Sequence, residues 1–134
     1  MKRFLIIDDD EGMCWALKKA LEHENRDILT ATSGSDGLAL FNVYEIDLIF
    51  LDIKMQDSNG LEVLQQIRQQ NLEVPVLIMT GYSSLSIALQ AIEKGATGYL
   101  TKPVQIPKLQ ETIKKIFSED DITEQKALPE LPGT

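Results

Sequence analysis

Short runs of apolar residues recur along this chain of 134 residues. These runs are separated by stretches in which apolar residues have helical spacing. A short apolar run rich in Ile, Val, Leu and Phe is typical of a strand that is buried on both faces of a sheet. The pattern predicts five strands, over residues 2–7, 27–32, 47–52, 74–79 and 98–100. The second of them is the most polar, which favours a place at the edge of the sheet.

A helix is predicted after each strand, because apolar residues return there at intervals of three and four. Asp10 and Ser33 can cap the first two helices, and the first helix is expected to stop around Asn25. Gly95 is expected to end the fourth helix, and Pro107 fits the first turn of the last one. The residues predicted to line the helices are Met13, Leu17, Ala20 and Leu21; Leu38, Ala39 and Phe41; Leu61, Leu64 and Ile67; Ile87, Ala88, Ala91 and Ile92; and Leu109, Ile113, Ile116 and Phe117.

Strands that alternate with helices imply right-handed crossovers and a parallel sheet. The expected fold class is therefore α/β: a three-layer, doubly wound, five-stranded parallel sheet with the flavodoxin-like strand order 2-1-3-4-5. Residues 1–117 are expected to form this domain. Residues 118–134 are acidic, contain prolines and show no periodicity, so we expect an acidic tail or an interdomain linker there.

Composition and charge narrow the class of protein. The net charge of −8 argues against direct nucleic-acid binding by this segment and favours a cation as cofactor. No apolar run approaches the roughly 18 residues of a membrane span, and the N-terminus lacks the features of a signal peptide. The lone cysteine, Cys14, cannot form an internal disulfide. These features predict a cytoplasmic protein that does not enter the membrane.

The candidate chemistry lies just after the strands, because ligands bind at the carboxyl ends of the strands of open α/β sheets. Asp8 and Asp9 follow the first strand, and Asp52 ends the third. Thr80 and Lys102 follow the fourth and fifth strands. Three neighbouring carboxylates repel one another unless a cation intervenes, and Mg²⁺, or else Mn²⁺, suits such oxygen ligands. Asp52 is accordingly predicted to be a nucleophile that accepts a phosphoryl group.

The chain resembles the receiver domains of response regulators, the phosphoacceptor half of two-component signalling, which share the CheY-like fold. The resemblance covers about residues 2–117 and extends most closely to receivers of the nitrogen-regulation (NtrC-like) class, on residues 80–84 and 94–96. Four motifs in the family's order and spacing carry it: Ile7-Asp8-Asp9-Asp10; Leu51-Asp52-Ile53-Lys54-Met55 with Asn59-Gly60; Met79-Thr80-Gly81; and Tyr99-Leu100-Thr101-Lys102-Pro103.

The resemblance implies the source of the phosphoryl group and the metal ligands. Asp52 would receive the group from the phosphohistidine of a sensor histidine kinase. Asp9, Asp52 and the backbone carbonyl of Lys54 would bind Mg²⁺ directly, and Asp8 would help through a water molecule. Lys102 would contact the phosphoryl group.

A change of conformation is also implied by the resemblance. Thr80 would move toward the phosphoryl group, and Tyr99 would turn inward behind it. These movements would alter the face formed by the fourth helix, the fifth strand and the fifth helix. The Lys102-Pro103 peptide bond is expected to be cis, and a homodimer that forms on phosphorylation is an open option.

Four positions bear on how fast this chemistry runs. The family usually has proline where this chain has Gln56, so the loop after Asp52 is expected to be looser. An arginine often stands at the position of Cys14, and its contacts are lost here. Lys54 and Tyr82 occupy positions that tune dephosphorylation. A bulky Tyr82 would hinder the attacking water, which predicts a longer phosphorylated lifetime than in fast chemotaxis-type receivers.

Several alternatives remain open from the sequence. A flavodoxin-type flavin binder, a haloacid-dehalogenase-type phosphatase and a phosphorylation-independent binding module are the rival functions. Within the receiver interpretation, the segment is expected to be a phosphoacceptor that assists its own phosphotransfer and autodephosphorylation, not an enzyme in the usual sense. The favoured output is transcription regulation through an effector domain outside this segment. The alternative is a stand-alone receiver that acts as a phosphorelay intermediate or a partner-binding switch.

Overall fold

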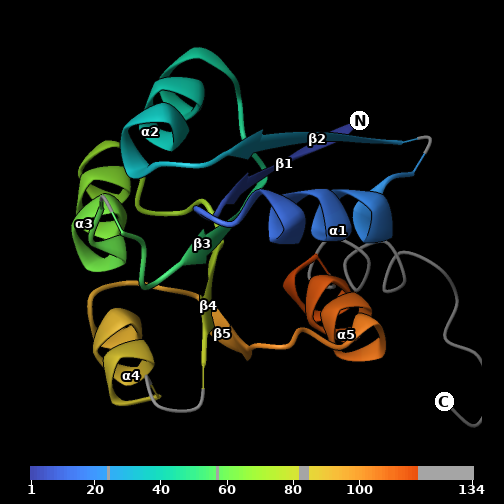
Figure 1. Ribbon diagram of the computed structural model, residues 1–134. Coiled ribbons are helices and arrows are strands. Elements are labelled where there is room, and N and C mark those ends of the chain that lie inside the picture. Colours follow the sequence, from blue (N-terminus) through green and yellow to red (C-terminus); the bar gives the residue numbers. More distant parts are fainter. Residues whose placement is uncertain (24, 57, 82–84, 118–134) are drawn as a thin grey trace, which may run out of the picture. The chain divides into compact units, whose positions relative to one another are not determined.

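Five parallel strands form one sheet in the order β2-β1-β3-β4-β5, which confirms the expected fold class (Figure 1). The computed structural model describes residues 1–23, 25–56, 58–81 and 85–117. The five strands are β1 (Lys2–Ile7), β2 (Arg26–Ala31), β3 (Leu48–Asp52), β4 (Val76–Thr80) and β5 (Gly98–Thr101). The five helices are α1 (Glu11–Leu21), α2 (Gly34–Val43), α3 (Gly60–Gln70), α4 (Leu85–Glu93) and α5 (Ile106–Ile116).

The chain divides into two units, Met1–Pro103 and Val104–Thr134. In the first unit, α1 covers one face of the sheet, and α2, α3 and α4 cover the other (Figure 1). This arrangement gives the three layers of a doubly wound fold. In the second unit, α5 begins with a proline in its first turn, as expected, and buries Leu109 and Ile113. None of the helices in the described stretches is both long and apolar enough to cross a membrane.

The core of the first unit follows from the alternation of side chains along buried strands. β3 and β4 are buried along their whole length, as their uninterrupted apolar runs predict. Alternating residues of the strands pack against the inner faces of the helices that follow β3 and β4. The strand and helix residues of this cluster are all buried. This core cluster consists of Leu5, Ile7, Ile49, Leu51, Ile53, Val63, Leu64, Ile67, Val74, Val76, Ile78, Ala91 and Ala96.

Side-chain and glycine signals fix several helix ends. The Asp10 side chain accepts a hydrogen bond from the Met13 N–H at 3.1 Å, as expected for an N-cap. The Ser33 hydroxyl accepts one from the Asp36 N–H at 3.1 Å in the same way. Gly95 has a φ of 111°, which a glycine adopts most readily, and its position just after α4 confirms its expected role.

Some predicted boundaries and inward positions are wrong. The first helix stops at Leu21, not around Asn25, because the chain turns at once into β2 through a hydrogen bond from the Arg26 N–H to the His23 carbonyl. β4 lies one to two residues later than the predicted segment 74–79. Two predicted lining residues are exposed instead, and these are Ala39 and Ile92.

Candidate functional site

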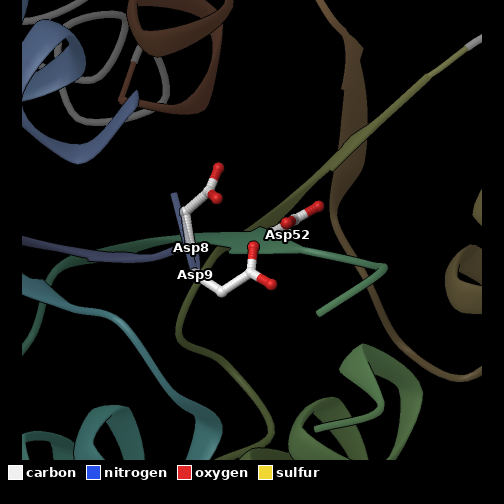
Figure 2. Close-up of side chains that lie close together, drawn as sticks. All are labelled: Asp8, Asp9 and Asp52. Carbon is white, nitrogen blue, oxygen red and sulfur yellow. The ribbon is translucent and has the colours of Figure 1, made fainter. Parts of the chain in front are cut away.

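Three aspartates come together at the carboxyl ends of β1 and β3. Ile7 pairs with Leu51 in the sheet, so that Asp8, one residue further, lies beside Asp52. Figure 2 shows Asp8 and Asp9 at the end of β1, with Asp52 on β3 next to them. One carboxylate oxygen from each of the three residues lies within 4.8 Å of the other two. The sheet register therefore assembles the acidic cluster that the order of the strands predicted.

Lys102 reaches the same cluster from the end of β5. Its Nζ lies 2.9 Å from Oδ2 of Asp8 and 3.4 Å from Oδ1 of Asp52. Asp8 is completely buried and Asp52 is 5% exposed, so both charges depend on a close partner. Burial lowers the pKa of Lys102, but its interactions with Asp8 and Asp52 outweigh burial and raise that pKa above its ordinary value. Lys102 is therefore a permanent cation of the site.

The Asp52 carboxyl is a much weaker acid than an exposed aspartate. Burial raises the pKa of Asp52, and the charge of Asp8 raises it further, to about 6, although Lys102 and the Lys54 N–H act in the opposite direction. A group with a pKa of about 6 is still roughly nine-tenths ionised at pH 7. Asp52 is thus a charged but poorly solvated carboxylate, which is the form that a nucleophile requires.

The loop between β3 and α3 packs closely against the carboxyl end of β3. Lys54 pairs with Asn59 across the loop, and the Gly60 N–H donates to the Ile53 carbonyl at 3.2 Å. A Cβ at position 60 would lie 2.7 Å from the carbonyl oxygen of Asp52, so only glycine allows this approach. Gly60 is therefore required by the close packing of the loop on the end of β3.

Gln56, which stands where the family usually has proline, contacts the site through its main chain. The Gln56 N–H donates a hydrogen bond of 2.8 Å to Oδ2 of Asp9. A proline, which the family usually has at this position, lacks an N–H and could not make this bond. The sequence predicted a looser loop here. In the structure, the backbone of Gln56 ties the loop to Asp9, a candidate metal ligand.

The expected switch residues lie on the neighbouring strands. Thr80 is 1% exposed and its hydroxyl donates to the Gly81 carbonyl at 3.2 Å, whereas Tyr99 on β5 is 39% exposed. The Lys102 N–H donates to the Thr80 carbonyl at 2.7 Å, which joins the ends of β4 and β5. The Lys102-Pro103 peptide bond is cis, as expected. Tyr82, the expected rate-tuning residue, lies outside the described residues.

Cys14 lies next to the site through a contact that the sequence did not predict. Its Sγ donates to the backbone carbonyl of Asp8 at 3.2 Å, from the buried side of α1. Burial, followed by the charge of Asp8, raises the pKa of the Cys14 thiol to about 11, so the group stays a neutral donor at pH 7. One signal in the sequence could have indicated this buried position. Cys14 stands three residues before Leu17, so the two residues lie on the same face of the helix.

The acidic cluster fits a small divalent cation. In octahedral Mg²⁺ coordination, with Mg–O distances of about 2.1 Å, ligand oxygens lie roughly 3 to 4 Å apart. Oxygens of Asp8, Asp9 and Asp52 that already lie within 4.8 Å of one another need only a small closure to reach such spacing. Hard carboxylate oxygens are also the donors that Mg²⁺ and Mn²⁺ prefer over softer metals. The donor set is therefore suited to the metal that the sequence predicted.

Comparison with known protein families gives a direct match. The family described as the response regulator receiver domain matches residues 4–114. The chain belongs to the response-regulator receiver family. Membership confirms the resemblance found in the sequence and decides against the flavodoxin-type and dehalogenase-type families. Receiver domains are signalling domains, so this segment is not an enzyme in the usual sense.

Two curated relatives illustrate the similarity. The transcriptional regulatory protein ZraR of Salmonella typhimurium is 37% identical over 114 residues, which cover 85% of this chain and 26% of that protein. The alkaline phosphatase synthesis transcriptional regulatory protein PhoP of Bacillus subtilis is 32% identical over 121 residues, which cover 90% of this chain and 50% of that protein. The chain thus spans about a quarter of the length of ZraR and half that of PhoP.

Solved structures of similar proteins are receivers as well. A receiver domain protein (CheY-like) from Methanospirillum hungatei has a TM-score of 0.83 and 32% identity, with 92% of this chain and 98% of that chain covered. The receiver domain of NtrX from Brucella abortus has a TM-score of 0.81 and 29% identity, with 86% and 98% covered. Together with ZraR, these matches support the placement among NtrC-like receivers.

Proposed function

We propose that this receiver accepts a phosphoryl group on Asp52 from the phosphohistidine of a sensor histidine kinase. One observation supports this proposal most strongly: the buried Asp52 carboxylate lies close to the Lys102 ammonium and to two further carboxylates. A positive group next to a cation-binding cluster is the environment that an incoming phosphoryl group requires.

The transfer exchanges one bond to phosphorus for another. An Asp52 oxygen attacks the phosphorus atom, the bond between phosphorus and the imidazole nitrogen breaks, and its electron pair stays on that nitrogen. Lys102, held 3.4 Å from Oδ1 of Asp52, donates a hydrogen bond to one phosphoryl oxygen. Thr80, buried at the end of the neighbouring strand, donates a hydrogen bond from its hydroxyl to another phosphoryl oxygen. Both residues balance charge that builds up on the transferred group.

Asp8, Asp9 and Asp52, with the backbone carbonyl of Lys54, would hold Mg²⁺ or alternatively Mn²⁺ in this site. When bound, the metal supplies positive charge that offsets the repulsion among the carboxylates and the phosphoryl oxygens. Lys102 already offsets part of that repulsion in the metal-free site, because its ion pairs involve Asp8 and Asp52.

Phosphorylation then changes the surface near β5. Once Thr80 turns its hydroxyl from the Gly81 carbonyl toward the phosphoryl group, space opens behind it for Tyr99 to turn inward. The half-exposed position of Tyr99 leaves its ring free to make that movement. The charge of the phosphoryl group acts locally, and it shifts the balance between two arrangements of the surface near β5. We propose that this change is the signal that a partner reads.

The proposed output is control of transcription, as the names of the relatives ZraR and PhoP suggest. Residues 1–117 would be the receiver, and residues 118–134 would link it to an effector domain. A cytoplasmic location agrees with the control of transcription and with a link to an effector domain. The alternative, a stand-alone receiver in a phosphorelay, uses the same chemistry at Asp52 and differs only in the partner.

The central test is incubation with acetyl phosphate and Mg²⁺, followed by measurement of the intact mass. We expect one added phosphoryl group per chain, absent in Asp52→Ala and strongly reduced when EDTA removes the metal. Asp36→Ala is the matched control, because Asp36 is an exposed carboxylate in the first turn of α2 and should leave the mass gain intact. A wild-type chain that gains no mass with Mg²⁺ or Mn²⁺ would contradict the proposal.

A further inference from the structure

The three carboxylates of the metal-ligand cluster do not share the same partner. Lys102 forms ion pairs with Asp8 and Asp52, at 2.9 Å and 3.4 Å. Asp9 makes no ion pair within the described part of the chain, and its Oδ2 accepts the Gln56 N–H at 2.8 Å instead. The third carboxylate is therefore held by a backbone amide from the loop after β3, 47 residues away in the sequence.

This hydrogen bond leaves Asp9 able to bind a metal. A carboxylate has two oxygens and about four acceptor positions, so one N–H on Oδ2 does not occupy the group. Figure 2 shows one Asp9 oxygen turned toward Asp52 and the other turned away from it. A carboxylate that is already fixed in this orientation loses less conformational freedom when a metal binds.

The loop that carries the donor is itself anchored on a second side. The Ser58 hydroxyl accepts a hydrogen bond of 3.1 Å from the Gly34 N–H at the start of α2. The loop after β3 is therefore tied to Asp9 by Gln56 and to α2 by Ser58. The Gln56 side chain is exposed, so the contact with the site comes from its main chain.

We propose that Gln56 is a positioning residue of the metal site: its backbone N–H orients Asp9 and ties the loop after β3 to the cluster before the metal arrives. The proposal rests on the proposed metal-dependent function of the site. Proline, the usual residue at this position in the family, cannot supply the N–H.

Calorimetric titration of the unphosphorylated, metal-free protein with Mg²⁺ tests this role. Gln56→Pro removes the N–H, whereas Gln56→Ala keeps it and removes only the exposed side chain. We expect Gln56→Ala to bind Mg²⁺ within about twofold of the wild type and Gln56→Pro to bind about tenfold more weakly, as is typical for the loss of a partner of a metal ligand. Equal affinities for the two variants would overturn the proposal.

A second measurement does not depend on a variant. Hydrogen exchange followed by NMR should show the Gln56 amide of the metal-free wild type protected by about tenfold relative to a free amide. An unprotected amide would overturn the proposal even if Gln56→Pro failed to fold. A wild type that binds no Mg²⁺ would contradict the proposed function as well, whereas normal wild-type binding with no effect of Gln56→Pro would contradict the positioning role alone.

Discussion

At the scale of single residues, the site is a set of carboxylates whose properties depend on their neighbours. Asp52 is buried next to Asp8, and the pKa of Asp52 rises to about 6 because burial and the Asp8 charge both oppose ionisation. Lys102 prevents a larger rise, since it lies close to both groups. Asp52, the proposed phosphoacceptor, is therefore ionised at pH 7 at a cost to the stability of the folded chain.

Replacement of Asp52 by Asn should stabilise the metal-free protein. A folded-state pKa of about 6, against an ordinary value of 3.8, means that ionisation of Asp52 costs roughly 3 kcal/mol. The cost is fully present above pH 6, falls as the pH drops below 6, and disappears only below about pH 3.8, where Asp52 is protonated in both the folded and the unfolded state. We expect Asp52→Asn to raise the free energy of unfolding in urea by about 1–3 kcal/mol at pH 7.5 and by much less at pH 4.5.

The control for this prediction is an exposed carboxylate. Asp36→Asn should change the free energy of unfolding by less than about 0.5 kcal/mol at pH 7.5. If Asp52→Asn gave the same change at both pH values, the burial of an ionised Asp52 could not be its cause.

At the scale of elements, the turn after α4 shows how a local signal fixes a boundary. The Gly95 N–H donates to the Ile92 carbonyl, and the Ala96 N–H donates to the Ala91 carbonyl, both within 3.0 Å. This pair of hydrogen bonds is a Schellman motif, which needs a residue with positive φ at its centre. The side chain of Arg68 on α3 adds a hydrogen bond of 2.9 Å to the Gly95 carbonyl.

Gly95→Ala should therefore destabilise the protein. A Cβ at this φ of 111° is strained and would lie 3.1 Å from Nε of Arg68, so we expect a loss of about 1–2 kcal/mol in the free energy of unfolding. Gly81→Ala is the matched control, because no described residue beyond its chain neighbours has an atom within 4 Å of the added Cβ, and its effect should stay below about 0.5 kcal/mol. Equal losses in the two variants would show that positive φ is not decisive at position 95.

At the scale of the whole molecule, Lys102 joins distant segments of the sheet. Its ammonium reaches from the end of β5 to Asp8 after β1, 94 residues away in the sequence, and to Asp52 on β3. The parallel order of the strands brings all these ends to one edge. Removal of Lys102 would leave the buried carboxylates of Asp8 and Asp52 without a positive partner among the residues that the structure describes.

Lys102→Met should lower the free energy of unfolding in EDTA by about 3 kcal/mol at pH 7.5, because unpaired buried charges are strongly destabilising. The loss should shrink near pH 5, where Asp52 can take up a proton, and Mg²⁺ should restore part of it by binding the folded state. Urea titrations with EDTA or Mg²⁺ at both pH values measure these changes.

Lys94→Met is the matched control, because Lys94 is an exposed lysine after α4, and a change below about 0.5 kcal/mol is expected there. A Lys102→Met variant as stable as Lys94→Met would show that the ion pairs contribute little.

The sequence by itself determined the elements, their order and which residues gather at the candidate site. Apolar runs marked β3 and β4 because a strand buried on both faces tolerates few polar side chains. Asp52 and Lys102 stood out because a strand end places them at the rim of a parallel sheet. Helix ends without a strong local signal were less certain, and the first helix ends at Leu21 because a tight turn leads into β2.

Only the tertiary structure decided which groups are partners. Lys102 pairs with Asp8 and Asp52, the Cys14 thiol donates to the Asp8 carbonyl, and the Gln56 N–H donates to Asp9. These contacts, and the pKa of Asp52 that follows from them, depend on distances and burial set by several strands at once. A proline missing from a motif is visible in the sequence. The hydrogen bond that its absence permits is visible only when β1 and the loop after β3 lie side by side.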